Sequence, residues 1–459
     1  MNHYQNSIII SIQNSISSLK DRLDQNYRVI FENIGWLSFD RILRLIVNLV
    51  LFGWIARYLG PGQFGYYNYA IAFIALFNAF TTLGLQGIVV RELVRKPNQK
   101  NEILGTVFGM KLIGAIFGFL LIVIITSLVH KGDQVTSTYV TIIAIGIFFQ
   151  PFSTIGLWYQ SQVKSKMVVI STGLSFILVS LAYIFAIITQ QNLITFLWIA
   201  VGSTFLDGVG LLLSYIFTNN NKIKWNFKIR VARGLFSQSW ILMLSGIGAM
   251  INLKIDQVMI GRLLTSNEVG VYSAAVKISE IWYFVPGYIV LSVFPLLIKT
   301  RDNDFLQYQN RVQRLYNLMV SLALIVAIIV TIFSDFIINL IYGSEYTNSA
   351  TILSIHIWAG IFVFIGEVLS KWIINEDLLI ISPIRHGAGG AINIILNLIF
   401  IPLLGGVGAA ISTIISYATS SYFVCFFHPR TRYTAKMMTR SLLFPFRFLY
   451  TGIIGRHIS

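Results

Sequence analysis

The stretch "IARYLGPGQFGYYNYA", residues 55–70, returns later in the chain as "IGRLLTSNEVGVYSAA", residues 260–275. The two stretches align without a gap and share Ile, Arg, Leu, Gly, Tyr and Ala at matched positions 205 residues apart. Each lies between two long apolar runs, and the first contains a Gly-Pro-Gly sequence typical of a tight turn. The repetition indicates a duplicated chain in which each copy forms a hairpin between two helices.

The apolar runs around these turns are long enough to cross a membrane. Hydrophobic residues make up 56% of the chain and charged residues 11%. About 20 apolar residues in a helix span a hydrocarbon core of roughly 30 Å. We therefore predict an all-α polytopic membrane protein, with two pseudo-symmetric six-helix lobes, as in many secondary transporters. The twelve expected spans are residues 37–59, 66–90, 103–129, 137–160, 167–189, 194–217, 236–264, 270–298, 316–341, 350–374, 384–403 and 406–427.

The net charge of +16 lies in alternate connections between these spans. Lys and Arg gather in stretches such as "RELVRKPNQKNE" and "NNNKIKWNFKIRVARG", whereas the opposite connections contain only Lys131. This is the positive-inside pattern, which records orientation rather than nucleic-acid binding. It predicts that both termini are cytoplasmic, with a further attraction to anionic lipid headgroups. The expected division is a lead-in at 1–36, lobes at 37–217 and 236–427, a basic linker at 218–235 and a basic tail at 428–459.

Motifs of enzymes are missing from the sequence. We find no phosphate-binding Walker loop, no GxSxG and no HExxH, and the connections are short. Cys425 is the single cysteine, so an intrachain disulfide and a cysteine-rich metal site are excluded. We expect a protein that is not an enzyme and needs no cofactor or metal.

Many ionisable residues fall at membrane depth, where charge is costly and usually faces a cavity or a partner. They are Arg41, Arg44, Arg57, Lys111, Asp207, Lys254, Asp256, Arg262, Lys277, Glu280, Asp335, His356, Glu367 and Lys371. So many charges predict a hydrated cavity between the lobes. Because cations outnumber acids, that cavity is expected to attract an anion, and Arg and Lys are the usual phosphate binders.

Several of these charges also have a structural interpretation. Arg57 and Arg262 lie within a turn or two of the outer ends of their spans, where snorkelling to the headgroups is the alternative. The same alternative applies to Arg41 and Arg44, which lie three apart near the inner end of the first span. Lys111 lies about two turns into its span and is harder to explain in this way.

The acidic residues differ in whether a lysine lies close to them along the same helix. Lys277 and Glu280 are three apart, which favours an ion pair within one helix. Lys254 and Asp256 are two apart and therefore point to different sides of their helix. Asp207 has no cation within a helical turn. The candidate substrate-binding residues are thus Arg41, Arg44, Arg57, Lys111, Lys254 and Arg262, and the candidates for coupling to a proton or Na⁺ are Asp207, Asp256 and Glu280.

Three stretches resemble a known family of bacterial polysaccharide transporters, the Wzx or O-antigen flippases. "IARYLGPGQFGYYNYA" followed by "LGLQGIVVRELVR" is similar to their opening hairpin. "INLKIDQVMIGRLLTSNEVGVYSAAVKISEIWYFVP" resembles their seventh and eighth spans, and "NIILNLIFIPLLGGVGAAISTIISY" their last two. The resemblance extends from about residue 35 to residue 427.

The resemblance implies a MATE-like fold, shared with multidrug exporters and the lipid II flippase. It also implies an undecaprenyl-diphosphate-linked oligosaccharide as substrate, moved from the inner to the outer leaflet of the bacterial inner membrane. Membrane lipids and other polysaccharide-assembly proteins would be its partners. "DRILR" brings Asp40, Arg41 and Arg44 to the place where lipid-flippase relatives carry arginines, but the chain lacks an arginine inside its second span. The alternative is a MATE-like exporter of small molecules, although an exporter of cationic drugs would favour an acidic cavity.

Overall fold

The computed structural model describes residues 25–218 and 223–454, with side chains for 43–218, 223–301 and 303–444. The side chain of Arg41, most of the expected lead-in, linker residues 219–222 and the end of the tail lie outside this part. The described residues form helices and no strand. The α-helices are α2 (Gln25–Ala75), α3 (Asn78–Thr82), α4 (Gln86–Arg95), α5 (Lys100–Val129), α6 (Gln134–Ile145), α7 (Thr154–Ser161), α8 (Ser165–Ile188), α9 (Leu193–Thr218), α10 (Ile229–Leu263), α11 (Ser266–Glu280), α12 (Phe284–Asn303), α13 (Phe305–Ile332), α14 (Ser334–Ile341), α15 (Asn348–His356), α16 (Ala359–Asn375), α17 (Ile381–Ser421) and α18 (Arg432–Ile454). Short 3₁₀ segments are η1 (Pro97–Gln99), η2 (Gly146–Ser153), η3 (Ile281–Tyr283), η4 (Ser344–Tyr346) and η5 (Phe423–Phe426).

Two of the helical runs are hairpins that turn at a glycine. Gly60 in α2 has φ 68° and ψ 167°, and Gly405 in α17 has φ 60° and ψ −138°. A positive φ of this kind favours glycine, which has no Cβ to clash. Residues on both sides of Gly60 line one cavity, and residues on both sides of Gly405 bind one carboxylate, so the chain folds back at each.

These hairpins explain how the predicted spans relate to the structure. Ten helical runs in the described chain are long and apolar enough to cross a membrane. The runs Leu43–Ala75 and Ile381–Phe426 each take in residues of two predicted spans. The all-α polytopic membrane fold is therefore confirmed, while the division into twelve spans stays a prediction.

The predicted span at 66–90 is interrupted in the structure. The helix ends at Ala75, and α3 and α4 follow, separated by Leu83 and Gly84, which have φ values of 51° and 63°. A Cβ on Gly84 would lie 2.7 Å from the backbone nitrogen of Met243 in α10. Glycine at this position thus serves both the turn and the close approach of α10.

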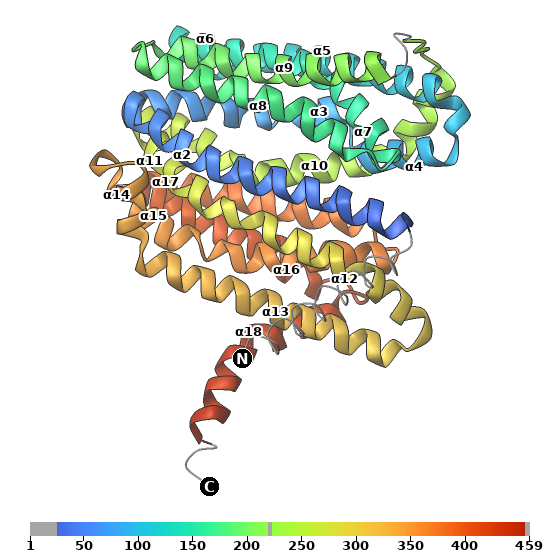
Figure 1. Ribbon diagram of the computed structural model, residues 1–459. Helices are drawn as coiled ribbons and strands as arrows, with labels where there is room; N and C mark the ends of the chain where they lie inside the picture. Colours follow the sequence, from blue (N-terminus) through green and yellow to red (C-terminus); the bar gives the residue numbers. More distant parts are fainter. Residues whose placement is uncertain (1–24, 219–222, 455–459) are drawn as a thin grey trace, which may run out of the picture.

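The two ends of the bundle differ in charge. Figure 1 shows α4, α7 and α12 at the right-hand end and α6, α14 and α15 toward the left. Lys96 and Lys164 lie in the connections after α4 and α7, and Arg301 lies in the last turn of α12. The charges thus gather at one end of the helices, which is the arrangement that the alternating loops predicted.

The repeated stretches pack against each other across the middle of the molecule. Helix α11 lies along α2, and α17 lies along α10. A Cβ on Gly65 would lie 1.7 Å from the carbonyl oxygen of Ser266, and a Cβ on Gly270 would lie 2.0 Å from that of Pro61. Gly65 and Gly270 occupy matched positions, so each copy presses its backbone into the glycine of the other. This contact explains why the chain carries the passage twice with its glycine retained.

A large apolar core surrounds this contact. It contains Ile55 and Phe64 from the first copy and Tyr272 from the second, all nearly inaccessible. Large apolar side chains such as Leu128, Phe185 and Ile332 are exposed on the outside of the helices. An apolar exterior is favoured in lipid, because lipid tails offer no hydrogen-bond partners to polar groups. A helix suits the same environment, since it satisfies its backbone polar groups internally.

Candidate functional site

One face of α2 lies between two cavities. Arg44, Asn48 and Phe52 are four residues apart and therefore share a helix face. All three line a cavity of about 310 Å³ that also includes residues of α11, which we call the central cavity. They also line a cavity of about 410 Å³ among α2, α6, η2, α8 and α9, which we call the N-chamber. For orientation, we refer to residues 43–218 as the N-terminal half and residues 223–444 as the C-terminal half.

The central cavity brings together cations from the two halves. Arg44 reaches it from α2, and Lys277 and Glu280 reach it from α11. The Lys277 Nζ lies 3.8 Å from the centroid of the Phe52 ring, a cation–π contact. The cavity therefore holds an arginine from one half and a lysine from the other.

Glu280 is paired with a different lysine from the one expected. Lys254 Nζ of α10 donates to Glu280 Oε1 and Oε2, each at 3.1 Å. The interpretation of Lys277 and Glu280 as an ion pair within one helix is therefore wrong, because the charge partner of Glu280 comes from a neighbouring helix. Lys254 and Asp256 do point to different sides of α10, as predicted, since Asp256 contacts other groups.

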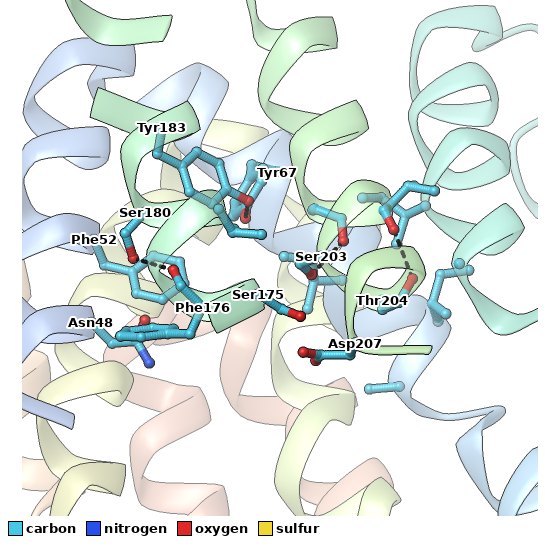
Figure 2. A pocket seen from close by; sticks show the side chains of 18 of the residues that line it. Asn48, Phe52, Tyr67, Ser175, Phe176, Ser180, Tyr183, Ser203, Thr204 and Asp207 are labelled. Atoms are coloured by element: carbon cyan, nitrogen blue, oxygen red, sulfur yellow. Dashed lines mark hydrogen bonds between the residues drawn. The ribbon is translucent and has the colours of Figure 1, made fainter. Parts of the chain in front are cut away.

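The N-chamber is lined by amides, hydroxyls and aromatic rings. Figure 2 shows Asn48 and Phe52 toward one side of the view and Ser203, Thr204 and Asp207 toward the other. Ser203 and Asp207 are four residues apart and share one face of α9. Among these residues sequence reasoning selected only Asp207 as a site candidate. The signal for the rest was polar side chains repeating at helical spacing inside apolar spans.

Arg44 is held at the border of the two cavities. Its Nη2 donates to Thr172 Oγ1 at 2.9 Å, and its guanidinium carbon lies 4.9 Å from the centroid of the Phe176 ring. Both partners belong to α8, so α8 positions the arginine from the N-terminal half. The guanidinium fork is suited to a bidentate contact with a phosphate.

Three other predicted cations lie elsewhere. Arg57 donates to the carbonyl oxygens of Asn339, Leu340 and Ile341, at 3.2, 2.6 and 3.1 Å, at the end of α14. Lys111 is buried in α5, where its Nζ donates to Ser153 Oγ at 2.9 Å. Among the described side chains, those lining the central cavity and the N-chamber do not include Arg57, Lys111 or Arg262.

Arg262 lies near the end of α5, beside His130. His130 shares a hydrogen bond of 2.8 Å between its Nε2 and the Tyr69 hydroxyl. Burial lowers the pKa of His130, the nearby carboxylate of Asp133 opposes this, and the positive charge of Arg262 lowers it further. The imidazole is therefore kept neutral at physiological pH.

The C-terminal half contains a buried acid in a network of hydrogen bonds. Asp256 Oδ1 accepts from Asn397 Nδ2 at 2.6 Å, and its Oδ2 accepts from Thr413 Oγ1 at 2.6 Å and from Tyr272 Oη at 2.9 Å. Asn397 also donates to Asn393 Oδ1 at 2.9 Å. Carboxylate, amide and hydroxyl oxygens are the ligands of hard cations. In the described part of the chain no three His, Cys, Asp or Glu side chains come together as a metal site.

The chain is similar to proteins of glycan export. Residues 54–351 match the family described as "Polysaccharide biosynthesis protein". The "Probable low-salt glycan biosynthesis flippase Agl15" of Haloferax volcanii is 24% identical over 80% of this chain and 76% of its own length. The "Putative O-antigen transporter" of Shigella flexneri is 24% identical over 71% of this chain and 80% of its own length.

Solved structures share the fold. The lipid II flippase MurJ in an inward closed conformation superposes with a TM-score of 0.64 at 18% identity, covering 92% of this chain and 93% of its own. A multidrug resistance MATE family transporter of the MOP superfamily, in an inward-facing conformation, gives 0.59 at 14% identity, covering 88% of this chain and 98% of its own. At these identities the likeness establishes the architecture, a MATE-like bundle of membrane helices.

Proposed function

Because the chain belongs to the polysaccharide biosynthesis protein family, we propose that it is a flippase for a lipid-linked oligosaccharide. The substrate would be an undecaprenyl-diphosphate-linked repeat unit of O-antigen or another surface polysaccharide. It would move from the inner to the outer leaflet of the bacterial inner membrane, with both termini of the protein in the cytoplasm. The related proteins are named as flippases and transporters, which fits a carrier rather than an enzyme.

The observation that carries this proposal is the pair of cations in the central cavity. Arg44 comes from the N-terminal half and Lys277 from the C-terminal half, and both line the same cavity. A diphosphate that leaves water needs compensating charge, which Arg and Lys supply. The contact of Lys277 with Phe52 is worth about 0.5–2 kcal/mol, so a phosphate oxygen can replace the ring.

We assign Lys254 a positioning role beside the central cavity, whose described lining includes its partner Glu280 but not Lys254 itself. Glu280 already takes its charge, and the pair fixes α10 against α11 beside Lys277. Arg57 and Arg262 would act at the hairpins rather than on the diphosphate. Lys111 would stabilise the N-terminal half through Ser153.

Transport would proceed by rocking of two lobes, residues 37–217 and 236–427, around the central cavity. The polyprenyl tail would stay in lipid while the diphosphate and sugars occupy the interior. An inside-negative membrane potential favours outward movement of an anion by about 2.3 kcal/mol per charge for each 100 mV. Each phosphate charge therefore adds to the driving force.

For ion coupling we favour Asp256 among the three acids. Its carboxylate is buried and accepts hydrogen bonds from Asn397, Thr413 and Tyr272. Glu280, in contrast, is paired with Lys254, and Asp207 lines the N-chamber. A proton or Na⁺ bound at Asp256 would neutralise the buried charge. Flipping by the Asp256→Asn variant should then lose its dependence on an imposed proton or Na⁺ gradient, while a retained dependence would exclude this acid.

The proposal is tested with the full chain in proteoliposomes. The probe is a fluorescent undecaprenyl-diphosphate-linked disaccharide, and the measurement is the rate at which it changes leaflet. Arg44→Ala and Lys277→Ala should each slow the rate at least about tenfold, because a charged hydrogen bond contributes about 1.5–3 kcal/mol. Lys131→Ala, which removes an exposed cation outside both cavities, serves as the matched control. A wild-type rate no higher than that of empty liposomes would overturn the proposal.

A further inference from the structure

We propose that the N-chamber binds the sugars next to the diphosphate and that Asp207 makes it select neutral over acidic sugars. This inference rests on the flippase function proposed above. It concerns a part of the cavity system that the diphosphate does not need. The chamber belongs to the N-terminal half alone and lies on the other side of Arg44 from Lys277.

The lining of the N-chamber suits a sugar. Ser175, Ser203 and Thr204 donate their hydroxyl protons to carbonyl oxygens of their own helices, at 3.2, 2.7 and 2.8 Å. Their oxygen lone pairs therefore remain available to accept from hydroxyl groups of a ligand. The rings of Phe52 and Phe176 add flat apolar surface for the C–H faces of a sugar ring. A sugar can donate its hydroxyl protons to these oxygen atoms and stack its apolar C–H face on these rings.

Gln150 and Asn78 add oriented amides to this lining. Gln150 Nε2 donates to Asn78 Oδ1 at 3.1 Å, and Gln150 Oε1 accepts from Thr81 Oγ1. These bonds fix which way the Gln150 amide faces the chamber. A fixed donor and acceptor can discriminate between sugar epimers, because a site with oriented polar groups rejects a ligand that leaves them unpaired.

Asn48 connects the chamber to the diphosphate position. It lines both cavities, four residues from Arg44 on the same face of α2. Within the described part of the chain its amide has no hydrogen-bond partner, although the side chain is partly buried. A partly buried amide usually finds a partner, so a ligand group at this position would satisfy it. A sugar attached to a diphosphate at Arg44 would lie beside Asn48.

The size of the chamber agrees with this assignment. Its volume of about 410 Å³ falls within the roughly 300–1,000 Å³ of small-molecule sites. The diphosphate and the first sugars would then occupy two adjoining cavities at once. Binding energy from the sugar would add to that from the diphosphate, which allows one scaffold to transport different glycans by changes in the chamber.

Asp207 gives the chamber its charge selectivity. Among the described residues that line the N-chamber, the charged ones are Arg44 and Asp207. Figure 2 shows Asp207 on the side away from Asn48, where sugars beyond the diphosphate would lie. A carboxylate accepts strong hydrogen bonds from sugar hydroxyls and repels the carboxylate of an acidic sugar. Neutral glycans should therefore be preferred.

The test compares two probes with the reconstituted full chain. One is an undecaprenyl-diphosphate-linked disaccharide of neutral N-acetylhexosamines, and the other carries a hexuronic acid as its second sugar. The wild type should flip the neutral probe about tenfold faster or more, and Asp207→Asn should bring the two rates close together. Asp207→Glu should keep the preference, and Arg44→Ala should slow both probes equally. Ser127→Ala, an exposed position in α5 away from both cavities, is the control.

The outcomes separate the two proposals. If the wild type flips neither probe, the proposed flippase function fails and the inference fails with it. If the wild type flips the probes but prefers the acidic one or neither, the chamber inference alone is overturned. The same holds if Asp207→Asn leaves the ratio unchanged while its thermal melting matches the wild type.

Discussion

The interiors of the two halves differ at positions that the duplication matches, which lie 205 residues apart in the chain. Tyr67 and Tyr272 lie 205 residues apart, and both side chains are almost fully buried. In the N-terminal half the hydroxyl of Tyr67 meets that of Tyr183 at 2.9 Å, and the position matching Asp256 is Leu51. In the C-terminal half Tyr272 donates to Asp256 instead. The same framework therefore holds an apolar residue in one half and a buried acid in the other.

This difference has a consequence for the space inside each half. The N-terminal half keeps a chamber of about 410 Å³ that is lined by polar side chains such as Asn48 and Ser203. In the C-terminal half many polar side chains bind one another. Ser416 Oγ donates to Asn252 Oδ1 at 2.6 Å, and Asn397 Nδ2 donates to Asp256 Oδ1. In the function that we propose, the polar groups of the N-terminal half bind the substrate, whereas those of the C-terminal half join α17 to α10.

Replacing Asp256 with leucine, the residue at the matched position, should have the largest effect on stability. Tyr272 and Asn397 would each lose an acceptor in a buried site, at about 1–3 kcal/mol per group. We expect a large fall in the melting temperature of the purified protein, and Asp256→Asn should fall less because it keeps a carbonyl acceptor. In the N-terminal half Leu51→Asp should also lower the melting temperature, because it would place a carboxyl group in an apolar core. A wild-type melting temperature for Asp256→Leu would show that the network does not fix these helices.

Placing a methyl group on Gly65 should have the next largest effect. Its Cβ would lie 1.7 Å from the Ser266 carbonyl oxygen, so the two hairpins would have to separate. In a Cys425→Ser background, a cysteine placed by Ser266→Cys should react faster with a membrane-impermeant maleimide when Gly65→Ala is added. Gly270→Ala should act in the same direction through Pro61.

Gly62→Ala is the matched control for this experiment. A Cβ on Gly62 meets nothing within 4 Å, although it belongs to the same turn. Its labelling rate should stay at the level of the parent. Equal labelling of the Gly65→Ala and Gly62→Ala proteins would contradict the reciprocal glycine contact.

The fold was largely predictable from the sequence because its signals are local or repeated. Apolar runs identify membrane helices, and the matched stretches identify the duplication. The turns at Gly60 and Gly405 fall between predicted spans, because glycine at the end of an apolar run marks a break. The break at Leu83 and Gly84 was not predicted, because it depends on the close approach of α10.

The site was predictable only in part. Position along a helix indicates the depth of a charge, but the neighbour that it faces depends on packing between distant helices. Arg44 was selected and lines both cavities, whereas Arg57 was selected and contacts carbonyl groups of α14. The importance of Lys277 depends on the Phe52 ring, which is distant in sequence. Hydroxyls such as Ser203 repeat at helical spacing inside apolar spans, but serine and threonine are common in membrane helices, so this spacing alone did not single them out.

The matched arginines offer a smaller test of the asymmetry. Arg57 donates to three carbonyl oxygens at the end of α14, where a positive charge is favoured by the helix dipole. In the described part of the chain Arg262 has no hydrogen-bond partner, and it acts on its surroundings through charge. Arg57→Ala should therefore cost about 1 kcal/mol and Arg262→Ala clearly less, as measured by thermal melting. Equal losses would mean that the two hairpins are held in the same way.

The smallest expected effect is a pH dependence confined to the contact around His130. The pKa of His130 is lowered by burial and by Arg262, with Asp133 opposing, while an unfolded histidine titrates near pH 6.5. Just below pH 6.5 the unfolded chain therefore binds more protons than the folded one, so stability falls as the pH is lowered through this window. Above about pH 7 both states are neutral and this contribution is fully present. The carbonyl groups that hold Arg57 do not titrate, so the other hairpin contact should be unaffected.

We expect this to appear as a loss of a few degrees in melting temperature between pH 7 and pH 5 that His130→Gln reduces. Gln keeps a polar group that can bind the Tyr69 hydroxyl, so the variant removes the titration while retaining a partner for that bond. Arg57→Ala should leave the slope of melting temperature against pH unchanged. Arg262→Ala should make it shallower, because it removes a positive charge that disfavours the imidazolium. A slope that is the same in the wild type and in His130→Gln would assign the pH dependence to other groups and leave the two hairpin contacts alike in this respect.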